Sequence, residues 1–191
     1  MAATEPIRDK RQIKALGDYF TRRGEHRNYV LIVMGVYTAL RVSDLLRLRW
    51  NDVYDFERGT VRRQINLTEQ KTGKRKTVAL NKTAVAALKR FRTQCDAKPD
   101  GFLFKSRRRR AAISRIQAYR IIRGAAEAVA IGRISCHSLR KTFGYHAWKN
   151  GTPTVVIMEI YNHNSFAVTR RYLGVSQDDK NGVYLGLRLL I

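Results

Sequence analysis

Residues 137–173 read HSLRKTFGYHAWKNGTPTVVIMEIYNHNSFAVTRRYL, and this stretch predicts three helices separated by short turns. The first helix is predicted over Ser138–Asn150, because Gly151 follows it at the position where a helix commonly ends in a left-handed residue. Thr152-Pro153 then supplies a cap and a first-turn residue for a second helix. A third helix is predicted over residues 165–173. The stretch therefore indicates a helical domain.

The chain around this stretch also follows mainly helical patterns. Apolar residues recur at helical spacing over five further ranges, which are 8–23, 27–40, 43–48, 81–95 and 114–129. Ser114 begins the last of these as the first residue of a capping box. One more helix is predicted close to the C-terminus, over residues 176–187.

One region has the alternation of strands instead. Polar and apolar residues alternate over residues 61–67 and again over 78–80, and Gly73 lies in the loop between them. This pattern predicts a β-hairpin that carries Lys71 and Lys74 near its tip. The whole chain is thus predicted to be mainly α with a small antiparallel β-sheet, an α+β fold.

The charge of the chain indicates a polyanionic partner. Lys and Arg total 38 and Asp and Glu total 15, so the formal net charge of the 191 residues is +23. Double-stranded DNA is the expected partner, because each neutralised phosphate releases counterions and this gain adds up along the backbone. A ribosomal protein or a membrane-surface protein is the alternative, but the latter usually concentrates its charge in one amphipathic helix. Here basic residues are spread along the chain, with one dense cluster at Lys105–Arg110.

Other classes of protein are disfavoured by the same sequence. The longest nearly apolar run, Tyr29–Tyr37, is about half of a membrane span. Residues 1–10 contain acidic side chains and no apolar core, unlike a secretory signal. Cys95 and Cys136 are too few for a disulfide framework. We therefore expect a cytoplasmic protein that has no membrane partner and is associated with the nucleoid when it binds DNA.

Most common catalytic motifs do not occur in the sequence. It has no Walker loop, no GxGxxG and no GxSxG, and its four histidines lack the spacing of zinc ligands. Acidic residues do not cluster as a two-metal nuclease requires. We therefore expect neither a metal nor another cofactor.

Four segments remain as candidates for a reactive site. They are Thr38–Leu46 around Arg41, the hairpin Lys71–Leu80, His137–Thr142 and Tyr161–Tyr172. Taken together and in this order, they resemble the catalytic domain of the tyrosine recombinase (phage integrase) family. The resemblance covers roughly residues 7–175, so the chain is expected to be a minimal, catalytic-domain-only member.

The resemblance implies a reaction in which a tyrosine cleaves and later reseals a DNA strand through a covalent 3′-phosphotyrosine ester, without metal or ATP. Tyr172 would be the nucleophile. Arg41 and Arg140 would bind the non-bridging phosphate oxygens, because guanidinium groups form paired, charge-assisted hydrogen bonds. His137 would accept and return the tyrosine proton, a role that suits its near-neutral pKa.

Three more roles follow from the resemblance. Lys71 would protonate the leaving 5′-oxygen, and counting back from Val78-Ala-Leu80 selects it over Lys74. His163 would donate a hydrogen bond to the scissile phosphate, although the family's Leu-Gly before this histidine is replaced here by Tyr161-Asn162. Asp44 would hold the basic groups in place. Further cations are expected to contact DNA, namely Lys74, Arg75, Lys76, Arg107, Arg108, Arg109 and Arg110.

The expected organisation is a catalytic domain over residues 1–175 and a C-terminal tail helix over 176–191. Val183, Leu187 and Leu190 form an apolar stripe on this tail, which would dock on its own domain or be exchanged with a neighbouring protomer. The resemblance implies that this chain assembles on DNA as a dimer to tetramer and that accessory DNA-binding proteins are among its candidate partners.

The predicted function is a site-specific DNA recombinase of the integrase, excisionase or invertase type. One alternative is a type IB topoisomerase, which uses a similar set of residues to relax supercoils. The other is a DNA-binding protein that keeps the fold without catalysis.

Overall fold

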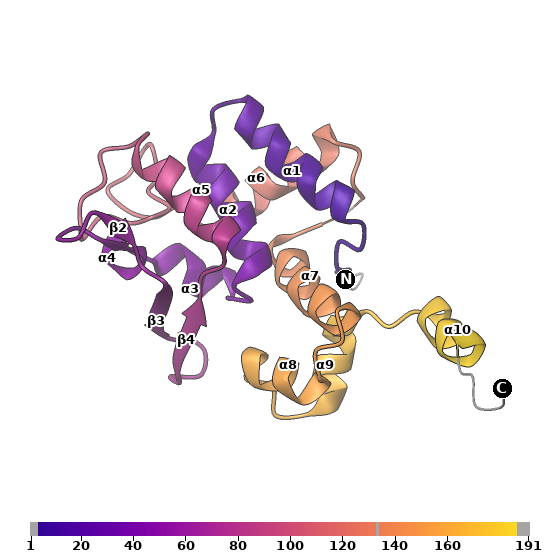
Figure 1. The fold of residues 1–191 in the computed structure, drawn as a ribbon. Helices are drawn as coiled ribbons and strands as arrows, with labels where there is room; N and C mark the ends of the chain where they lie inside the picture. Colours follow the sequence, from indigo (N-terminus) through magenta and orange to yellow (C-terminus); the bar gives the residue numbers. More distant parts are fainter. Residues whose placement is uncertain (1–3, 133, 187–191) are drawn as a thin grey trace.

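The fold is described from a computed structural model, which covers residues 4–132 and 134–186. Its helices are α1 (Lys10–Arg22), α2 (His26–Tyr37), α3 (Val42–Arg47), α4 (Trp50–Val53), α5 (Lys82–Arg92), α6 (Arg115–Ala128), α7 (Cys136–Lys149), α8 (Thr154–Tyr161), α9 (Phe166–Leu173) and α10 (Gln177–Gly186). Its strands are β1 (Tyr54–Asp55), β2 (Thr60–Val61), β3 (Gln64–Thr68) and β4 (Arg75–Ala79). The prediction of a mainly α fold with a small antiparallel sheet is confirmed (Figure 1).

Side-chain caps explain where several helices begin. Asn81 accepts a hydrogen bond from the Ala84 amide, and Ser114 accepts one from the Gln117 amide, as expected for N-cap residues. Ser135 caps α7, so this helix starts at Cys136, two residues earlier than the sequence predicted. The capping interaction brings His137 into the first turn of α7.

The strands form two ribbons rather than one sheet. β3 pairs with β4 in antiparallel register, with Ile65 opposite Val78. Val61 instead lies in β2 and pairs with Tyr54 of β1. The prediction that residues 61–67 form one strand of the hairpin is therefore wrong for residue 61, because that strand begins at Gln64. The β3–β4 hairpin projects from the domain, with its loop at the free end (Figure 1).

The main hydrophobic core is built around α2. Residues 30–36 of this helix are buried, and α2 packs against α1, α5 and α7. A methyl group added to Gly35 would lie 2.7 Å from Leu139 Cδ1, so glycine permits α2 and α7 to approach closely. This contact sets the position of α7 relative to the chain that follows α2 and carries Arg41.

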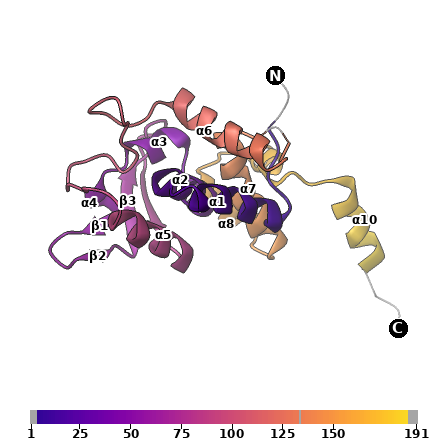
Figure 2. The same ribbon diagram turned by 90° about the horizontal axis from the view of Figure 1, so that it is seen from above.

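The segment from α7 to α9 has a smaller core of its own. Ile157, Tyr161 and Leu173 are buried together there with Ala39, which follows α2, and α8 and α9 lie beside α7 (Figure 1). Figure 2 shows α8 next to α7 from above. Tyr161 is fully buried, and its hydroxyl donates to the Arg140 carbonyl at 2.6 Å. The core therefore holds α8 and α9 against the helix that carries His137 and Arg140.

The last helix, α10, extends away from the rest of the molecule (Figure 1). An ion pair between Lys149 and Asp179 links its first turn to α7, while Val183, Tyr184 and Leu185 are exposed. Leu187 and Leu190 of the predicted apolar stripe lie outside the described residues. Over residues 4–132 and 134–186, none of the helices has both the length and the apolar character needed to cross a bilayer.

Candidate active site

A groove of about 1120 Å³ lies between the β3–β4 loop, the start of α3, the start of α6, α7 and α9. Five of the six predicted catalytic residues line it, namely Arg41, Lys71, His137, Arg140 and Tyr172. These residues come from four segments that are far apart in the sequence. The fold thus brings together the groups that the sequence motifs singled out.

Arg140 is the most buried of these residues, with 2% of its surface exposed. Its guanidinium donates to the Ala39 carbonyl and, at 3.1 Å, to the Tyr161 carbonyl. Its Cζ atom also lies 4.6 Å from the centre of the Tyr161 ring. Burial, followed by repulsion from Arg41, lowers the pKa of Arg140 from its ordinary value. Backbone oxygens therefore fix this guanidinium at the floor of the groove.

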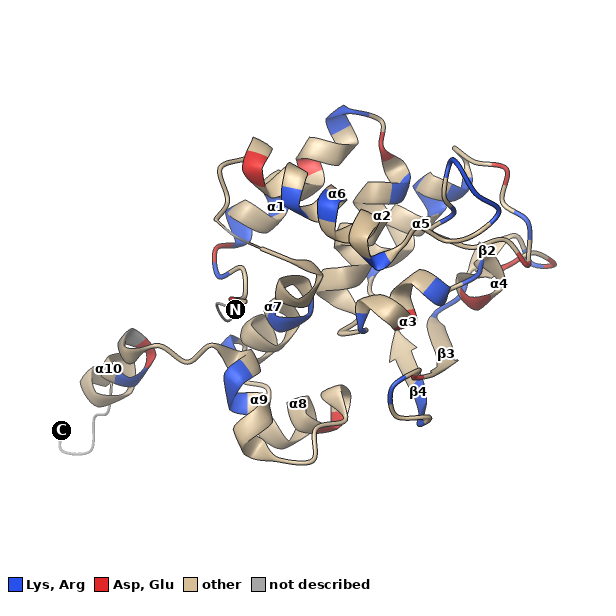
Figure 3. Ribbon diagram, turned by 180° about the vertical axis from the view of Figure 1, so that it is seen from behind, with Lys and Arg blue, Asp and Glu red and all other residues tan. Residues whose placement is uncertain are grey.

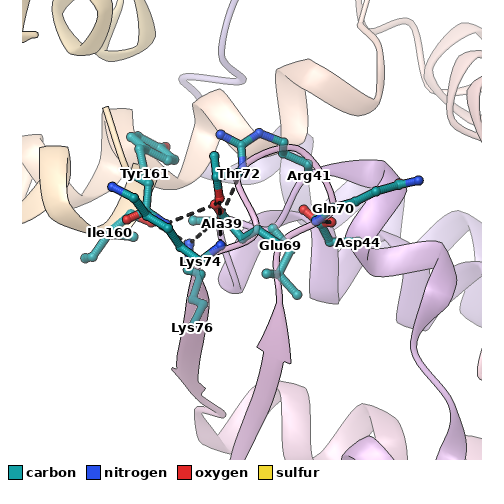
Figure 4. Close-up of polar contacts among 12 residues, drawn as sticks. Ala39, Arg41, Asp44, Glu69, Gln70, Thr72, Lys74, Lys76, Ile160 and Tyr161 are labelled. Atoms are coloured by element: carbon teal, nitrogen blue, oxygen red, sulfur yellow. Dashed lines mark hydrogen bonds and ion pairs between the residues drawn. The ribbon is translucent and has the colours of Figure 1, made fainter. Parts of the chain in front are cut away.

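Arg41 is the N-cap residue of α3, and 22% of its side chain is exposed. Its Nη1 atom lies 2.9 Å from Glu69 Oε1, and this carboxylate is fully buried (Figure 4). Burial alone would raise the pKa of Glu69. Hydrogen bonds from Thr72 and Asn162, together with the Arg41 pair, outweigh this effect and lower the pKa to about 2. Glu69 is therefore a buried anion that faces Arg41.

The hairpin loop carries Lys71, whose side chain is exposed at the edge of the groove. Asp44 is buried in α3, and its Oδ1 atom accepts a hydrogen bond of 2.9 Å from the Gln70 amide. The other carboxylate oxygen, Asp44 Oδ2, is buried and has no hydrogen-bond partner among the residues that the structure describes. Asp44 thus anchors the residue that precedes Lys71, and its charge also acts on Lys76.

Tyr172, at the end of α9, lies among aromatic and basic groups. The centre of its ring is 4.9 Å from that of His137 and 4.5 Å from that of His163. Arg140 Cζ lies 5.9 Å from the same ring. His163 does not line the groove, but it contacts the nucleophile candidate directly. All six predicted catalytic residues therefore occupy one region of the molecule.

The turn before His163 keeps the geometry that a glycine would permit. Asn162 adopts a left-handed conformation with φ of 54° at the end of α8, and asparagine tolerates this region better than most residues. The replacement of Leu-Gly by Tyr161-Asn162 therefore does not disrupt the turn. His163 Nδ1 lies 3.0 Å from Thr169 Oγ1, and Thr169 is fully buried.

Both histidines of the site are less basic than usual. Loss of solvent lowers the pKa of His137, and three nearby cations, Lys141 first, lower it further. For His163, burial is again the largest cause, followed by repulsion from Arg140, and the pKa falls to about 4. Both imidazoles are consequently neutral near pH 7.

The predicted DNA contacts lie in three different settings. Lys74 and Arg75 are exposed beside the hairpin tip. Lys76 points inward, since 9% of its side chain is exposed and its Nζ atom donates to the Ile160 carbonyl. Burial and repulsion from Arg140 lower its pKa to about 8. Residues 107–110 lie on the exposed loop between α5 and α6, outside the groove (Figure 3).

Two residues of the site were missed by the sequence motifs. Glu69 lies outside the four matched segments, two positions before Lys71, and Thr169 lies inside Tyr161–Tyr172 but was given no role. The signal that could have indicated Glu69 was its acidic side chain in an otherwise basic loop. Within the residues that the structure describes, no three His, Cys, Asp or Glu side chains gather as a metal ion would require.

Comparisons with known proteins show the family of this chain. The model of the phage integrase family matches residues 8–178. The chain is 35% identical over 184 residues to the probable integrase/recombinase YoeC of Bacillus subtilis, covering 96% of this chain and 97% of that protein. It is 34% identical over 152 residues to the type 1 fimbriae regulatory protein FimE of Escherichia coli, covering 76% of this chain and 73% of that protein.

Other relatives are longer. Tyrosine recombinase XerA of Pyrococcus furiosus is 28% identical over 148 residues, and the chain covers 50% of its length. A crystal structure of XerA recombinase superposes with a TM-score of 0.78 and 25% identity, covering 100% of this chain and 66% of that one. A post-cleavage complex of XerH bound to difH superposes with a TM-score of 0.73 over 97% of this chain and 54% of that one. At 17% identity, the latter likeness shows the fold alone.

Proposed function

This chain belongs to the phage integrase family and is a site-specific tyrosine recombinase, and on that premise we propose that it cleaves and rejoins DNA through Tyr172. The observation that carries the proposal is the groove that gathers Arg41, Lys71, His137, Arg140 and Tyr172. The net charge of +23 supports double-stranded DNA as the substrate. The relatives named for recombination support the same reaction.

The nucleophilic step uses the aromatic cluster around Tyr172. The phenolic oxygen attacks the scissile phosphorus, an O–P bond to the tyrosine forms, and the bond from phosphorus to the 5′-oxygen breaks. His137 takes the phenolic proton, because it is neutral near pH 7 and its ring lies 4.9 Å from the tyrosine ring. Rotation of either side chain when DNA binds would bring the two groups within hydrogen-bond distance.

Two guanidinium groups stabilise the charge that develops on the phosphate. Arg140 is already fixed by two backbone carbonyls, so its position needs little reorganisation during the reaction. Arg41 faces the same groove from the start of α3. His163 adds a hydrogen bond. We propose that the Thr169 hydroxyl donates to His163 Nδ1, which leaves the proton on Nε2 for the phosphate.

Lys71 completes the cleavage by protonating the leaving 5′-oxygen. Its place on an exposed loop allows it to follow the leaving group, and Asp44 limits this movement by holding the Gln70 amide. Resealing runs the same steps in reverse, with His137 returning its proton to Tyr172. No ATP or metal is needed in this scheme, because the phosphotyrosine ester retains the energy of the cleaved bond.

The wider assembly is also part of the proposal. Lys74, Arg75 and the arginines of residues 107–110 contact the DNA backbone, and two to four copies act together on the recombining sites. The exposed apolar side chains of α10 support its exchange between protomers. Accessory DNA-binding proteins and association with the nucleoid belong to the same proposal.

A nicked suicide duplex tests the reaction, because loss of the short 5′ fragment traps the covalent product. Wild-type protein should form an SDS-resistant adduct, and peptide mass mapping should locate it at Tyr172. Tyr172→Phe should form none, whereas Tyr37→Phe, which alters an exposed tyrosine of α2 outside the groove, should react at the wild-type rate. An adduct that persists in Tyr172→Phe contradicts the assignment of the nucleophile. Relaxation of supercoiled DNA without a defined site would instead favour a topoisomerase.

A further inference from the structure

Glu69 is a buried carboxylate whose contacts reach several parts of the active site. It is 1% exposed and lies in the loop that follows β3. Its Oε1 atom is 2.9 Å from Arg41 Nη1 and 3.8 Å from Lys76 Nζ. Its Oε2 atom accepts hydrogen bonds from Thr72 Oγ1 at 2.8 Å and from Asn162 Nδ2 at 3.0 Å. Figure 4 shows this carboxylate between the hairpin loop and Arg41.

These partners belong to three separate pieces of the site. Arg41 lies at the start of α3, and Thr72 is adjacent to Lys71 in the hairpin loop. Asn162 directly precedes His163. One carboxylate therefore joins the phosphate-binding arginine, the loop of the proposed general acid and the turn that carries the second histidine.

The electrostatic surroundings explain why an anion is needed at this position. Burial lowers the pKa of Lys76, and repulsion from Arg140 and from Arg41 lowers it further. Burial followed by repulsion from Arg41 lowers the pKa of Arg140 as well. Glu69 lies among these cations and remains ionised at neutral pH. A neutral residue in its place would leave the cations facing one another in a region with little water, where repulsion is strong.

We propose that Glu69 is a positioning residue, which holds one edge of the Arg41 guanidinium so that the remaining donors face the scissile phosphate. A buried ion pair often adds little net stability, because its attraction must offset the loss of solvation. A guanidinium is planar and offers donors on more than one edge, so it can contact Glu69 and a phosphate at the same time. This inference rests on the proposed phosphoryl transfer at Tyr172.

The test compares Glu69→Gln with wild type and with Glu127→Gln. The control also changes a glutamate that pairs with an arginine, but this pair lies on the exposed surface of α6. Single-turnover adduct formation on the nicked duplex should slow by about 10- to 100-fold in Glu69→Gln, because a small displacement of a reacting group is costly. Its affinity for DNA should equal or exceed that of wild type, since the protein gains one positive charge. Glu127→Gln should match wild type in adduct formation.

A second substrate separates positioning of Arg41 from a general structural effect. A methylphosphonate at the scissile position has no charged non-bridging oxygen, so an arginine directed at that charge contributes less. The ratio of the wild-type rate to the Glu69→Gln rate should fall at least about fivefold on this substrate, as it should for Arg41→Ala. An unchanged ratio for Glu69→Gln, alongside a reduced one for Arg41→Ala, overturns the inference.

The remaining outcomes are also decisive. Wild-type protein that forms no adduct refutes the proposed function itself, whereas a wild-type rate in Glu69→Gln refutes the positioning role alone. If Glu69→Gln does not fold, Thr72→Val replaces it, because this change removes one hydrogen bond to the carboxylate in an exposed loop. Cleavage that is at least threefold slower, with unchanged DNA affinity, supports the inference. A wild-type rate in Thr72→Val contradicts it.

Discussion

Replacing either active-site arginine by lysine should slow cleavage, but only one replacement should weaken the fold. Arg140→Lys and Arg41→Lys both keep a positive charge and lose the planar fork that binds a phosphate at two points. Each is expected to reduce single-turnover adduct formation by about 10²- to 10³-fold, the range for removing one donor group from a transition-state site.

The difference in stability follows from the partners of each guanidinium. Arg140 donates to the carbonyls of Ala39 and Tyr161, and both of these residues are fully buried. A lysine ammonium on a flexible stem reaches one of them at best. The other carbonyl then loses its partner, at a cost of about 1–3 kcal/mol. For a chain of this size, that corresponds to a fall in Tm of about 2–12 °C.

Arg41 makes an ion pair with Glu69 instead, and a lysine can retain that pairing. The free energy of unfolding of Arg41→Lys should therefore stay within about 0.5 kcal/mol of wild type. Thermal unfolding of the free proteins and adduct formation on the nicked duplex provide the two measurements. Equal shifts in Tm for the two variants, or an unchanged Tm for Arg140→Lys, would refute this account of the Arg140 contacts.

Three further predictions concern the surroundings of the site. Asn162→Gly keeps the left-handed turn but removes the hydrogen bond to Glu69, so it should slow cleavage while leaving Tm within about 1 °C of wild type. Asn162→Ala should slow cleavage and also lower Tm, because alanine is strained at φ of 54°. The pKa of His137 is lowered, so this base stays neutral at pH values below the ordinary histidine pKa of 6.5. The cleavage rate should therefore decline on the acid side with a midpoint below pH 6.5. A midpoint above pH 6.5 in a single-turnover pH profile would contradict this. Lys74→Ala should reduce the slope of log affinity against log salt by about 1, because Lys74 is exposed. Lys76→Met should leave that slope unchanged, since Lys76 points inward. Equal slopes for the two variants would show that exposure does not separate these lysines as DNA contacts.

The helices could be predicted from the sequence because their signals are local. Asn81 and Ser114 cap the helices that they were expected to begin, and Gly151 has the left-handed conformation expected after α7. The strands were predicted less well. Val61 continues the alternation of residues 61–67, yet it pairs with Tyr54, because pairing depends on which strand lies alongside and the pattern does not contain this information.

The chemical groups of the site could also be identified from the sequence, but their individual environments could not. Lys74 and Lys76 are two positions apart in a basic run and look equivalent there. In the structure Lys74 is exposed, whereas Lys76 is buried against Ile160 and Glu69. Lys74 lies in the hairpin loop, whereas Lys76 lies in β4, where its ammonium reaches the Ile160 carbonyl of α8, so a tertiary contact decides the difference.

By itself, the sequence determined the order of the longer helices, the strongly basic character of the chain and the residues that we propose form and break a phosphate ester. The tertiary structure alone decided that Glu69 faces Arg41, that Arg140 is fixed by backbone oxygens and that Asp44 accepts a hydrogen bond from the hairpin loop. Helix caps and turns depend on neighbours within a few residues, so local patterns encode them. The contacts of Glu69 and Arg140 join residues up to 101 positions apart, and their geometry depends on how whole helices pack.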